Sequence, residues 1–163
     1  PRRLDGLLER LGRIRHVETL RIHSRVPVAD PLRIDADLVA ALRQARAVWL
    51  SVHVNHVREL GAEAVAALAR IADAGVPLLA QTVLLRGVND DPEALATLFR
   101  RLVALRVKPY YLHHPDLAPG TGHFRLAISR GQAIFRALRG RVPGHALPTY
   151  VLDIPGGAGK VPV

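Results

Sequence analysis

Short apolar runs and longer segments with helical spacing alternate along the chain. The runs predict strands at residues 16–24, 47–53, 76–85, 107–112 and 149–153. The segments between them carry apolar residues at i, i+3 and i+4, and predict helices at residues 3–11, 36–43, 62–74, 92–105 and 130–138. Capping residues agree with these helices: Gly75 fits a helix end, Asp91 before Pro92 fits a helix start, and Ser129 is expected to cap the last helix.

Strands that alternate with helices of this length are typical of βα units in a parallel sheet, so the sequence predicts an α/β fold. In such folds ligands bind at the carboxyl edge of the sheet. Polar residues gather at the predicted carboxyl ends of the strands, namely Ser24, Arg25, His53, Gln81, His113 and Asp116. We therefore expect the functional site along this edge.

Composition narrows the class of protein. The 163 residues are 49% hydrophobic but only 4% aromatic, which predicts one domain with a core of Leu, Val, Ile and Ala. No apolar run reaches the roughly 18 residues of a membrane span, and no secretory leader is seen, so we expect a cytoplasmic protein without a membrane partner. The chain has no cysteine, which excludes disulfides and thiolate metal ligands within it.

The net charge of +9 raises nucleic acid as a partner. The arginines, however, are scattered over predicted polar helix faces rather than grouped, and the few aromatic residues are spread along the chain. RNA-binding surfaces combine clustered basic and aromatic side chains. A basic RNA-binding α/β module thus remains an alternative, but we do not expect nucleic-acid binding.

The histidines invite a metal interpretation. His53 and His56 form H-x-x-H at a strand end, where this spacing is poor for two ligands of one ion, and His113 and His114 are adjacent and point to opposite faces of a strand. We predict no metal site.

Gln81 lies inside an apolar strand, where its amide needs a partner within the barrel or from a ligand, because leaving it unsatisfied costs roughly 1–3 kcal/mol.

Lys160 is one of only two lysines and follows the glycine-rich run at 156–159. The run is not a phosphate-binding P-loop, because the first glycine of that motif is missing and Val161 replaces its hydroxyl residue. Two interpretations remain open from the residues alone. Lys160 is either a solvated lysine near a chain end or an amine that forms a Schiff base with a carbonyl cofactor such as pyridoxal phosphate (PLP).

A resemblance favours the second interpretation. The stretches HVETLRIHSRVPV, VWLSVHVNHVRE, GVPLLAQTVLLRGVND, RVKPYYLHHPDL, GHFRLAISRG and LPTYVLDIPGGAGKVPV occur in this order. Together they resemble the C-terminal part of the lysine 2,3-aminomutase family, whose members are radical S-adenosylmethionine (SAM) enzymes that also use PLP. The resemblance implies the second half of a partial (β/α), TIM-like barrel, with residues 1–140 in the barrel and residues 141–163 as a C-terminal segment that carries the PLP lysine.

The resemblance also implies roles for single residues. Lys160 would hold PLP, and Asp116 and Asp153 would bind the side-chain ammonium group of the substrate L-lysine. His53 and the edge formed by Ser24 and Arg25 would face SAM, and Gln81 would lie near the reacting cofactors. His113 stands where the family has a tyrosine close to the PLP ring. The related epimerase that acts on a lysine of an elongation factor lacks the two aspartates and is the alternative within enzymes.

The cluster-binding motif C-x-x-x-C-x-x-C is absent from the chain. The resemblance therefore implies that the ligands of the [4Fe-4S] cluster lie in an upstream half of the same barrel, and that this chain alone is inactive. We expect the complete enzyme to interconvert L-lysine and β-lysine as a homo-oligomer. In the isolated chain we expect two open sheet edges, at residues 16–24 and 107–112, and an interior lined by Val52, Leu79, Val83 and Tyr111.

Overall fold

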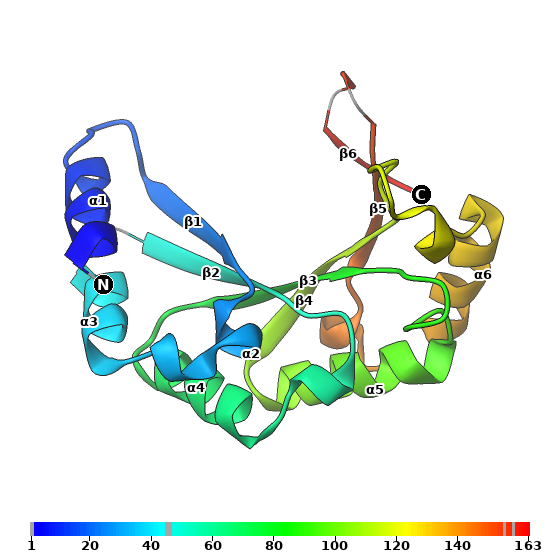
Figure 1. Cartoon of the computed structure of the whole chain (residues 1–163), viewed down its shortest axis with the longest axis horizontal. Coiled ribbons are helices and arrows are strands. Elements are labelled where there is room, and N and C mark those ends of the chain that lie inside the picture. The colour runs from blue at the N-terminus through cyan, green and yellow to red at the C-terminus, as the bar shows by residue number, and fades with distance from the viewer. Residues whose placement is uncertain (1, 45–46, 155, 158) are drawn as a thin grey trace.

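The computed structural model of the chain describes residues 2–44, 47–154, 156–157 and 159–163. Its centre is a single curled sheet of six strands in the order β1-β2-β3-β4-β5-β6 (Figure 1). The strands are β1 (Thr19–Ser24), β2 (Ala47–His53), β3 (Leu78–Val83), β4 (Val107–His113), β5 (Thr149–Asp153) and β6 (Lys160–Pro162). The first five are parallel to one another, and β6 runs antiparallel to β5.

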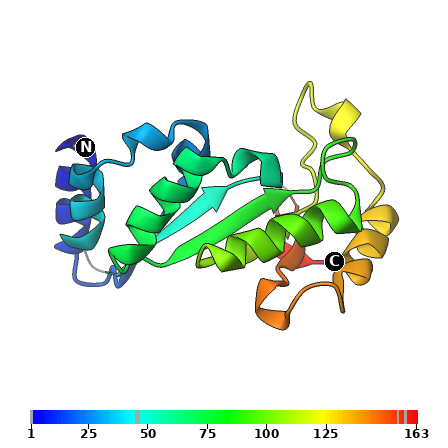
Figure 2. The same ribbon diagram turned by 90° about the horizontal axis from the view of Figure 1, so that it is seen from below.

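Helices cover the convex side of the sheet and leave its concave side open (Figures 1 and 2). The α-helices are α1 (Arg2–Gly12), α2 (Val26–Ala29), α3 (Ala36–Gln44), α4 (Ala62–Asp73), α5 (Pro92–Ala104) and α6 (Ile128–Leu138). Single 3-10 turns lie at Pro31–Arg33, Val57–Glu59, Gly122–Phe124 and Gly144–Ala146. The arrangement is the half-barrel of βα units that the sequence predicts.

The hydrophobic core lies between the sheet and these helices. Helix α4 buries one apolar stripe, consisting of Ala64, Ala67, Leu68 and Ile71. Helix α5 does the same with Leu95, Ala96, Leu98, Phe99 and Leu102. These stripes have the three- and four-residue spacing of a helix face and pack against inward-facing strand residues such as Leu50, Val52 and Leu78. Packing on one face leaves the other face of each strand available for a site.

Most predicted elements are found, with ends that differ by a few residues. Asp91 caps α5 as predicted, because its side chain accepts a hydrogen bond from the Ala94 amide and Pro92 begins the helix. Gly75 follows α4 with a φ of +79°, a conformation that glycine adopts without strain. The cap predicted at Ser129 is wrong, because α6 already begins at Ile128 and Ala127 occupies its N-cap.

Two expectations about the sheet are also wrong. The edge expected open at residues 107–112 is covered, because β4 pairs with β5. Val52 was expected to line the barrel interior, but it is fully buried in the core on the helix side. Strand β6 was not predicted at all, since three residues after a glycine-rich run give too short a pattern. It pairs with β5 through Val151 and Pro162, Leu152 and Val161, and Asp153 and Lys160.

Candidate active site

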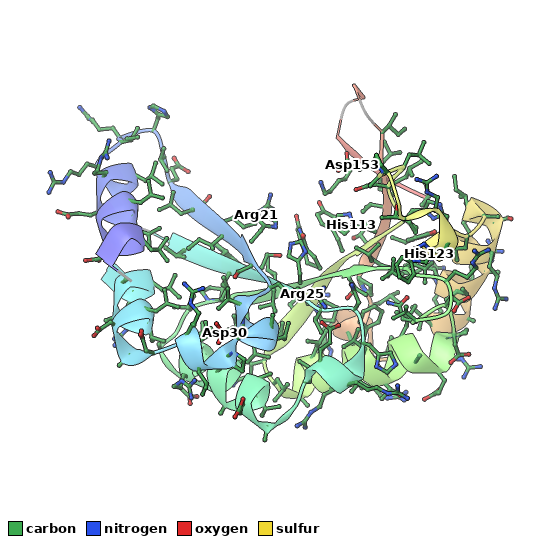
Figure 3. All side chains as sticks on the ribbon, in the orientation of Figure 1. Arg21, Arg25, Asp30, His113, His123 and Asp153 are labelled. Carbon is green, nitrogen blue, oxygen red and sulfur yellow. The ribbon has the colours of Figure 1, made fainter. Side chains whose placement is uncertain are left out.

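The strand register brings two of the predicted site residues, His53 and Gln81, into one row across the sheet with Tyr111, which was expected to line the interior. His53 of β2 lies opposite Gln81 of β3, and Gln81 lies opposite Tyr111 of β4. A register shift between Ala80 and Gln81 makes this pairing with Tyr111 instead of Tyr110. His113 lies two residues further along β4 on the same face, and its side chain points to the open side of the sheet, as does that of Arg21 (Figure 3).

His53 lies beside a second histidine. The ring centroids of His23 and His53 are 6.0 Å apart in an edge-to-face arrangement. Partial burial, together with the nearby His23 and Arg25, lowers the pKa of His53 below its ordinary value. At neutral pH His53 is therefore an uncharged imidazole that can accept or donate a hydrogen bond at this edge of the sheet.

Ser24 and Arg25 are adjacent in sequence, but their side chains contact different parts of the protein. The Ser24 hydroxyl accepts a hydrogen bond from the Val26 amide at 3.1 Å, and it lines a cavity of about 260 Å³ between the sheet and helices α1 and α3. Arg25 instead forms an ion pair with Glu59. The structure thus directs Ser24 to the helix side of the sheet and does not bring its side chain into the row of His53 and Gln81.

The Gln81 side chain is buried, with 7% of its surface exposed. The sequence predicted that such an amide needs a partner. Within the part of the chain that the structure describes, no side-chain hydrogen bond of Gln81 is found, in contrast to its neighbour Thr82, whose hydroxyl donates to the Val54 carbonyl at 2.8 Å. Gln81 therefore presents an amide to the concave side that a ligand can satisfy.

A network of two asparagines fixes the loops behind this row. The side-chain oxygen of Asn55 accepts a hydrogen bond from the Val83 amide at 2.9 Å. Asn89 is buried, accepts from the Leu85 amide at 2.7 Å, and donates to the Asn55 and Val83 carbonyls at 2.7 and 2.9 Å. Through these bonds Asn89 ties the turn that follows β3 to the end of β2.

Glu59 was missed in the same region. Its carboxylate accepts from the amides of Asn55 and His56 at 2.7 and 2.9 Å, and it also holds Arg25 by the ion pair described above. One carboxylate therefore connects the ends of β1 and β2. The only hint in the sequence was a charged residue three positions after His56, which is the spacing of the capping box seen in the structure.

At the other end of the sheet, Asp116 and Asp153 line one cavity of about 690 Å³. Asp153 ends β5, and Asp116 lies in the loop that follows β4. The remaining walls are mainly apolar, with Arg125 as the other charged residue; they are His114, Pro115, Leu117, Ala118, Leu126, Ile128, Leu152 and Ile154. Two carboxylates with apolar walls suit a ligand that combines an alkyl chain with a cationic group.

Lys160 is connected to this cavity because its amine binds Asp153, which lines the cavity. The two residues are opposite one another in the β5–β6 ladder, and the Lys160 Nζ donates to an Asp153 carboxylate oxygen at 2.9 Å. Both side chains are partly exposed, 34% for Lys160 and 45% for Asp153. The amine is therefore accessible from solvent and held at a defined place.

His113 lies close enough to Lys160, Asp116 and Asp153 for their charges to change its pKa. Burial is the main cause that lowers its pKa, and Lys160 lowers it further, while Asp116 and Asp153 act in the opposite direction. Its ring stands edge-to-face with Tyr111 at a centroid distance of 5.6 Å. Its Nε2 atom is buried and finds no hydrogen-bond partner among the described residues. A buried polar atom without a partner is uncommon in folded proteins, and it marks a place where a ligand atom can bind.

A buried pair supports the loop that carries Asp116. His114 Nδ1 lies 2.7 Å from the Tyr150 hydroxyl, and burial raises the pKa of Tyr150 to about 12. The aromatic ring of Tyr150 is almost fully buried between β5 and helix α6. This hydrogen bond joins the end of β4 to β5, and so connects the segments that carry Asp116 and Asp153.

Among the described residues, no group of three or more His, Asp or Glu side chains has the geometry of a metal site. The chain also has no cysteine, so its residues do not fit an iron–sulfur cluster held by thiolates. None of the described helices is long and apolar enough to cross a membrane.

Two solved structures share the fold. A domain of the pyruvate-formate lyase-activating enzyme from Bacteroides vulgatus aligns over 93% of this chain and 92% of its own, with a TM-score of 0.60 and 15% identity. A radical SAM methyltransferase from Sphaerobacter thermophilus aligns over 82% of this chain and 40% of its own, with a TM-score of 0.55 and 22% identity. The predicted half-barrel fold is therefore confirmed.

Curated relatives are much more similar in sequence. The L-lysine 2,3-aminomutase of Methanococcus maripaludis is 47% identical over 98% of this chain, and that of Bacillus subtilis is 42% identical over 97%. The glutamate 2,3-aminomutase of Clostridioides difficile is 38% identical over 98%. The chain spans 37%, 34% and 38% of the lengths of these relatives. No family model matches the chain. The predicted resemblance is therefore confirmed: over nearly its whole length the chain is similar to one part of enzymes of the lysine 2,3-aminomutase family.

Proposed function

We propose that this chain supplies the cofactor lysine and the substrate pocket of an enzyme that interconverts L-lysine and β-lysine by moving an amino group between neighbouring carbons. The observation that carries the proposal is the meeting of Lys160, Asp153 and Asp116 at one end of the sheet. The names of the relatives support the class of reaction, an amino-group migration within one molecule.

The residues around Lys160 fit an aldehyde cofactor such as PLP. The amine is accessible, and the unpartnered Nε2 of His113 lies near it on the same side of the sheet. Tyr111 stands against His113 and offers an aromatic surface. PLP bound here would carry the migrating amino group through the rearrangement. In this proposal Lys160 attaches the cofactor, and His113 binds one of its polar atoms.

The cavity supports lysine as the substrate. The side-chain ammonium of lysine would bind between Asp116 and Asp153, and its methylene groups would lie along the apolar walls. A glutamate side chain would instead bring a third carboxylate to this pair, where like charges repel. The two aspartates therefore favour lysine over the substrate named for the glutamate 2,3-aminomutase relative. They also separate this chain from the elongation-factor epimerase considered above.

Radical generation would use SAM and a [4Fe-4S] cluster whose ligands lie outside this chain. His53 and Gln81 are the residues of the chain that we propose to face SAM, with Arg25 held nearby by Glu59. Residues 1–140 would then form part of a barrel, residues 141–163 would carry the cofactor lysine, and an upstream half of the same barrel would complete the site in a homo-oligomer. The chain alone is expected to be inactive.

Reductive labelling tests the role of Lys160. The purified chain is incubated with PLP, reduced with borohydride and digested, and the labelled peptides are identified by mass spectrometry. We expect the label on the C-terminal peptide that contains Lys160. Lys108 is an internal control, because it is the other lysine of the chain and its amine instead donates to the Leu147 carbonyl. Label confined to Lys108 or the N-terminal amine would contradict the assignment.

The roles of Asp116 and Asp153 need an enzyme that contains the cluster-binding half. Asp116→Asn or Asp153→Asn in such an enzyme should abolish most lysine turnover while labelling of Lys160 by PLP persists. The two carboxylates are partly exposed in the structure, and the bound substrate would cover them; removing one partner of a charged contact buried in this way costs roughly 2–5 kcal/mol in binding. Lysine kinetics like those of the unmodified enzyme in both variants would leave the aspartates without this role.

A further inference from the structure

Two ammonium groups can bind the Asp153 carboxylate at this site. The proposed function gives its carboxylate to the ammonium group of the substrate, but in the structure the carboxylate already binds an ammonium group of the chain itself, that of Lys160. Asp116, the other aspartate of the cavity, has no ion pair among the described residues. The two acidic residues of the pocket are therefore not equivalent before any ligand binds.

The contact between Lys160 and Asp153 follows from the backbone. Residues 153 and 160 are opposite one another in the antiparallel ladder, and the next pair, Leu152 and Val161, continues it. Cross-strand partners on one face of a sheet bring their side chains together, and opposite charges at such positions attract. The pairing of β5 with β6 thus holds the Lys160 amine against Asp153 whenever the hairpin is formed.

We propose that Lys160 acts as an internal competitor of the substrate's side-chain ammonium group for Asp153, so that attachment of the aldehyde cofactor to Lys160 opens the substrate pocket. This inference rests on the proposed function. It predicts an order of loading in which the cofactor binds first and the substrate's ammonium group second. Both steps involve the same side chain, because the residue that leaves Asp153 is the residue that takes the cofactor.

The chemistry of attachment explains the release. The protonated Lys160 amine and the aldehyde combine to form a C=N bond, and the carbonyl oxygen leaves as water with two of the three amine hydrogens. The nitrogen keeps one hydrogen and the positive charge, which the C=N bond now spreads onto the neighbouring carbon, and its bonding becomes planar. A group with three N–H donors that can turn toward Asp153 is thereby replaced by a group with one donor whose direction is fixed by the C=N bond. The carboxylate is then free for another ammonium group.

The test measures lysine binding to the 163-residue chain by amide chemical-shift titration, with norleucine as the control ligand because it lacks the side-chain amine. We expect Lys160→Met to bind lysine about two- to fivefold more tightly than the unmodified chain, which is the range for losing a competing, partly exposed ion pair. Norleucine binding should not change. Lys108→Met is the matched control, since it removes the other lysine without touching Asp153, and it should bind lysine as the unmodified chain does.

A second background separates competition from general charge. In the Asp153→Asn chain, Lys160→Met should give no gain in lysine affinity, because the group for which both amines compete is absent. A gain of the same size in that background would mean that Lys160 acts by its charge alone, and would overturn the inference. Equal affinity of the Lys160→Met and unmodified chains would also overturn it.

These outcomes are distinct from failure of the proposed function. If Asp116→Asn and Asp153→Asn weaken lysine binding while Lys160→Met has no effect, the substrate pocket stands and only the competition is refuted. If lysine binding is insensitive to both aspartates, the pocket assignment fails and the inference fails with it. Labelling of Lys160 by PLP and borohydride reports separately on the cofactor role.

Discussion

Gly131 of helix α6 lies where no larger residue fits. A Cβ atom built at this position would be 1.9 Å from the Tyr150 hydroxyl oxygen, 2.8 Å from the Tyr150 Cζ and 3.2 Å from a Leu84 methyl carbon. Tyr150 cannot simply move aside, because it is almost fully buried and its hydroxyl is hydrogen-bonded to His114. Gly131→Ala must therefore displace either the tyrosine or the helix.

The cost can be estimated from these contacts. Overpacking a core typically costs about 1–3 kcal/mol. Breaking the His114–Tyr150 hydrogen bond while its partners stay buried costs a further ~1–3 kcal/mol. Alanine is more favourable than glycine within a helix by about 1 kcal/mol, which offsets part of the loss. We expect Gly131→Ala to lower the free energy of unfolding by about 1–5 kcal/mol, and the melting temperature by about 2–4 °C for each kcal/mol.

Urea unfolding followed by circular dichroism measures this effect, and Gly6→Ala is its matched control. Gly6 lies inside helix α1 with no atom within 4 Å of its Cβ position, so the same substitution should stabilise the chain there by about 0.5–1 kcal/mol. Tyr150→Phe removes the atom that clashes most, so Gly131→Ala should cost less in that background. The reasoning is refuted if Gly131→Ala is as stable as the unmodified chain, or if Tyr150→Phe leaves its cost unchanged.

Three further predictions concern the loops, pH and association. Asn89→Ala should lower the free energy of unfolding by roughly 2–4 kcal/mol, because it leaves buried partners of three hydrogen bonds unsatisfied. Urea unfolding measures this loss, and Asp90→Ala is the control because it removes a single, exposed hydrogen bond. A loss for Asn89→Ala no larger than that for Asp90→Ala would contradict the prediction. Burial lowers the pKa values of His53, His113 and His114 below 6.5, so the unfolded chain binds more protons than the folded chain. The free energy of unfolding should therefore fall as the pH drops through and below about 6.5. Urea unfolding across this pH range measures the dependence, and His113→Gln should make it less steep. The open edge of β1 and the partly exposed Trp49 on the concave side should make the isolated chain self-associate, which size-exclusion chromatography with light scattering detects, and a monodisperse monomer would refute this.

The sequence predicted the fold through patterns that depend on single elements. Helices α4 and α5 bury stripes with helical spacing, and their ends follow from Gly75 and Asp91. The start of α6 was misjudged, because a serine near a helix start looks like a cap whether the helix begins after it or one residue before it. Strand β6 could not be predicted, since its three residues form a strand only by pairing with β5.

The candidate site shows the same division. The carboxyl-end rule brought His53, Gln81 and His113 to one edge of the sheet, as the strand register requires. It could not tell that the Ser24 side chain turns to the helix side, because the direction of a residue at a strand end depends on the turn that follows. Nor could it reveal the contact between Lys160 and Asp153 or the role of Glu59, which join residues that are distant in the chain or on different strands.

The two edges of the sheet differ in what they can accept. Strand β6 is three residues long and ends in Pro162, which has no amide hydrogen to offer a further strand. Strand β1 has six residues and no proline. A fibre grows only when two different edges can join repeatedly, whereas contacts of one edge with its own copy close after two chains. The sheet therefore has a blocked edge at β6 and an open edge at β1, so we expect association through its edges to stop at a symmetric pair.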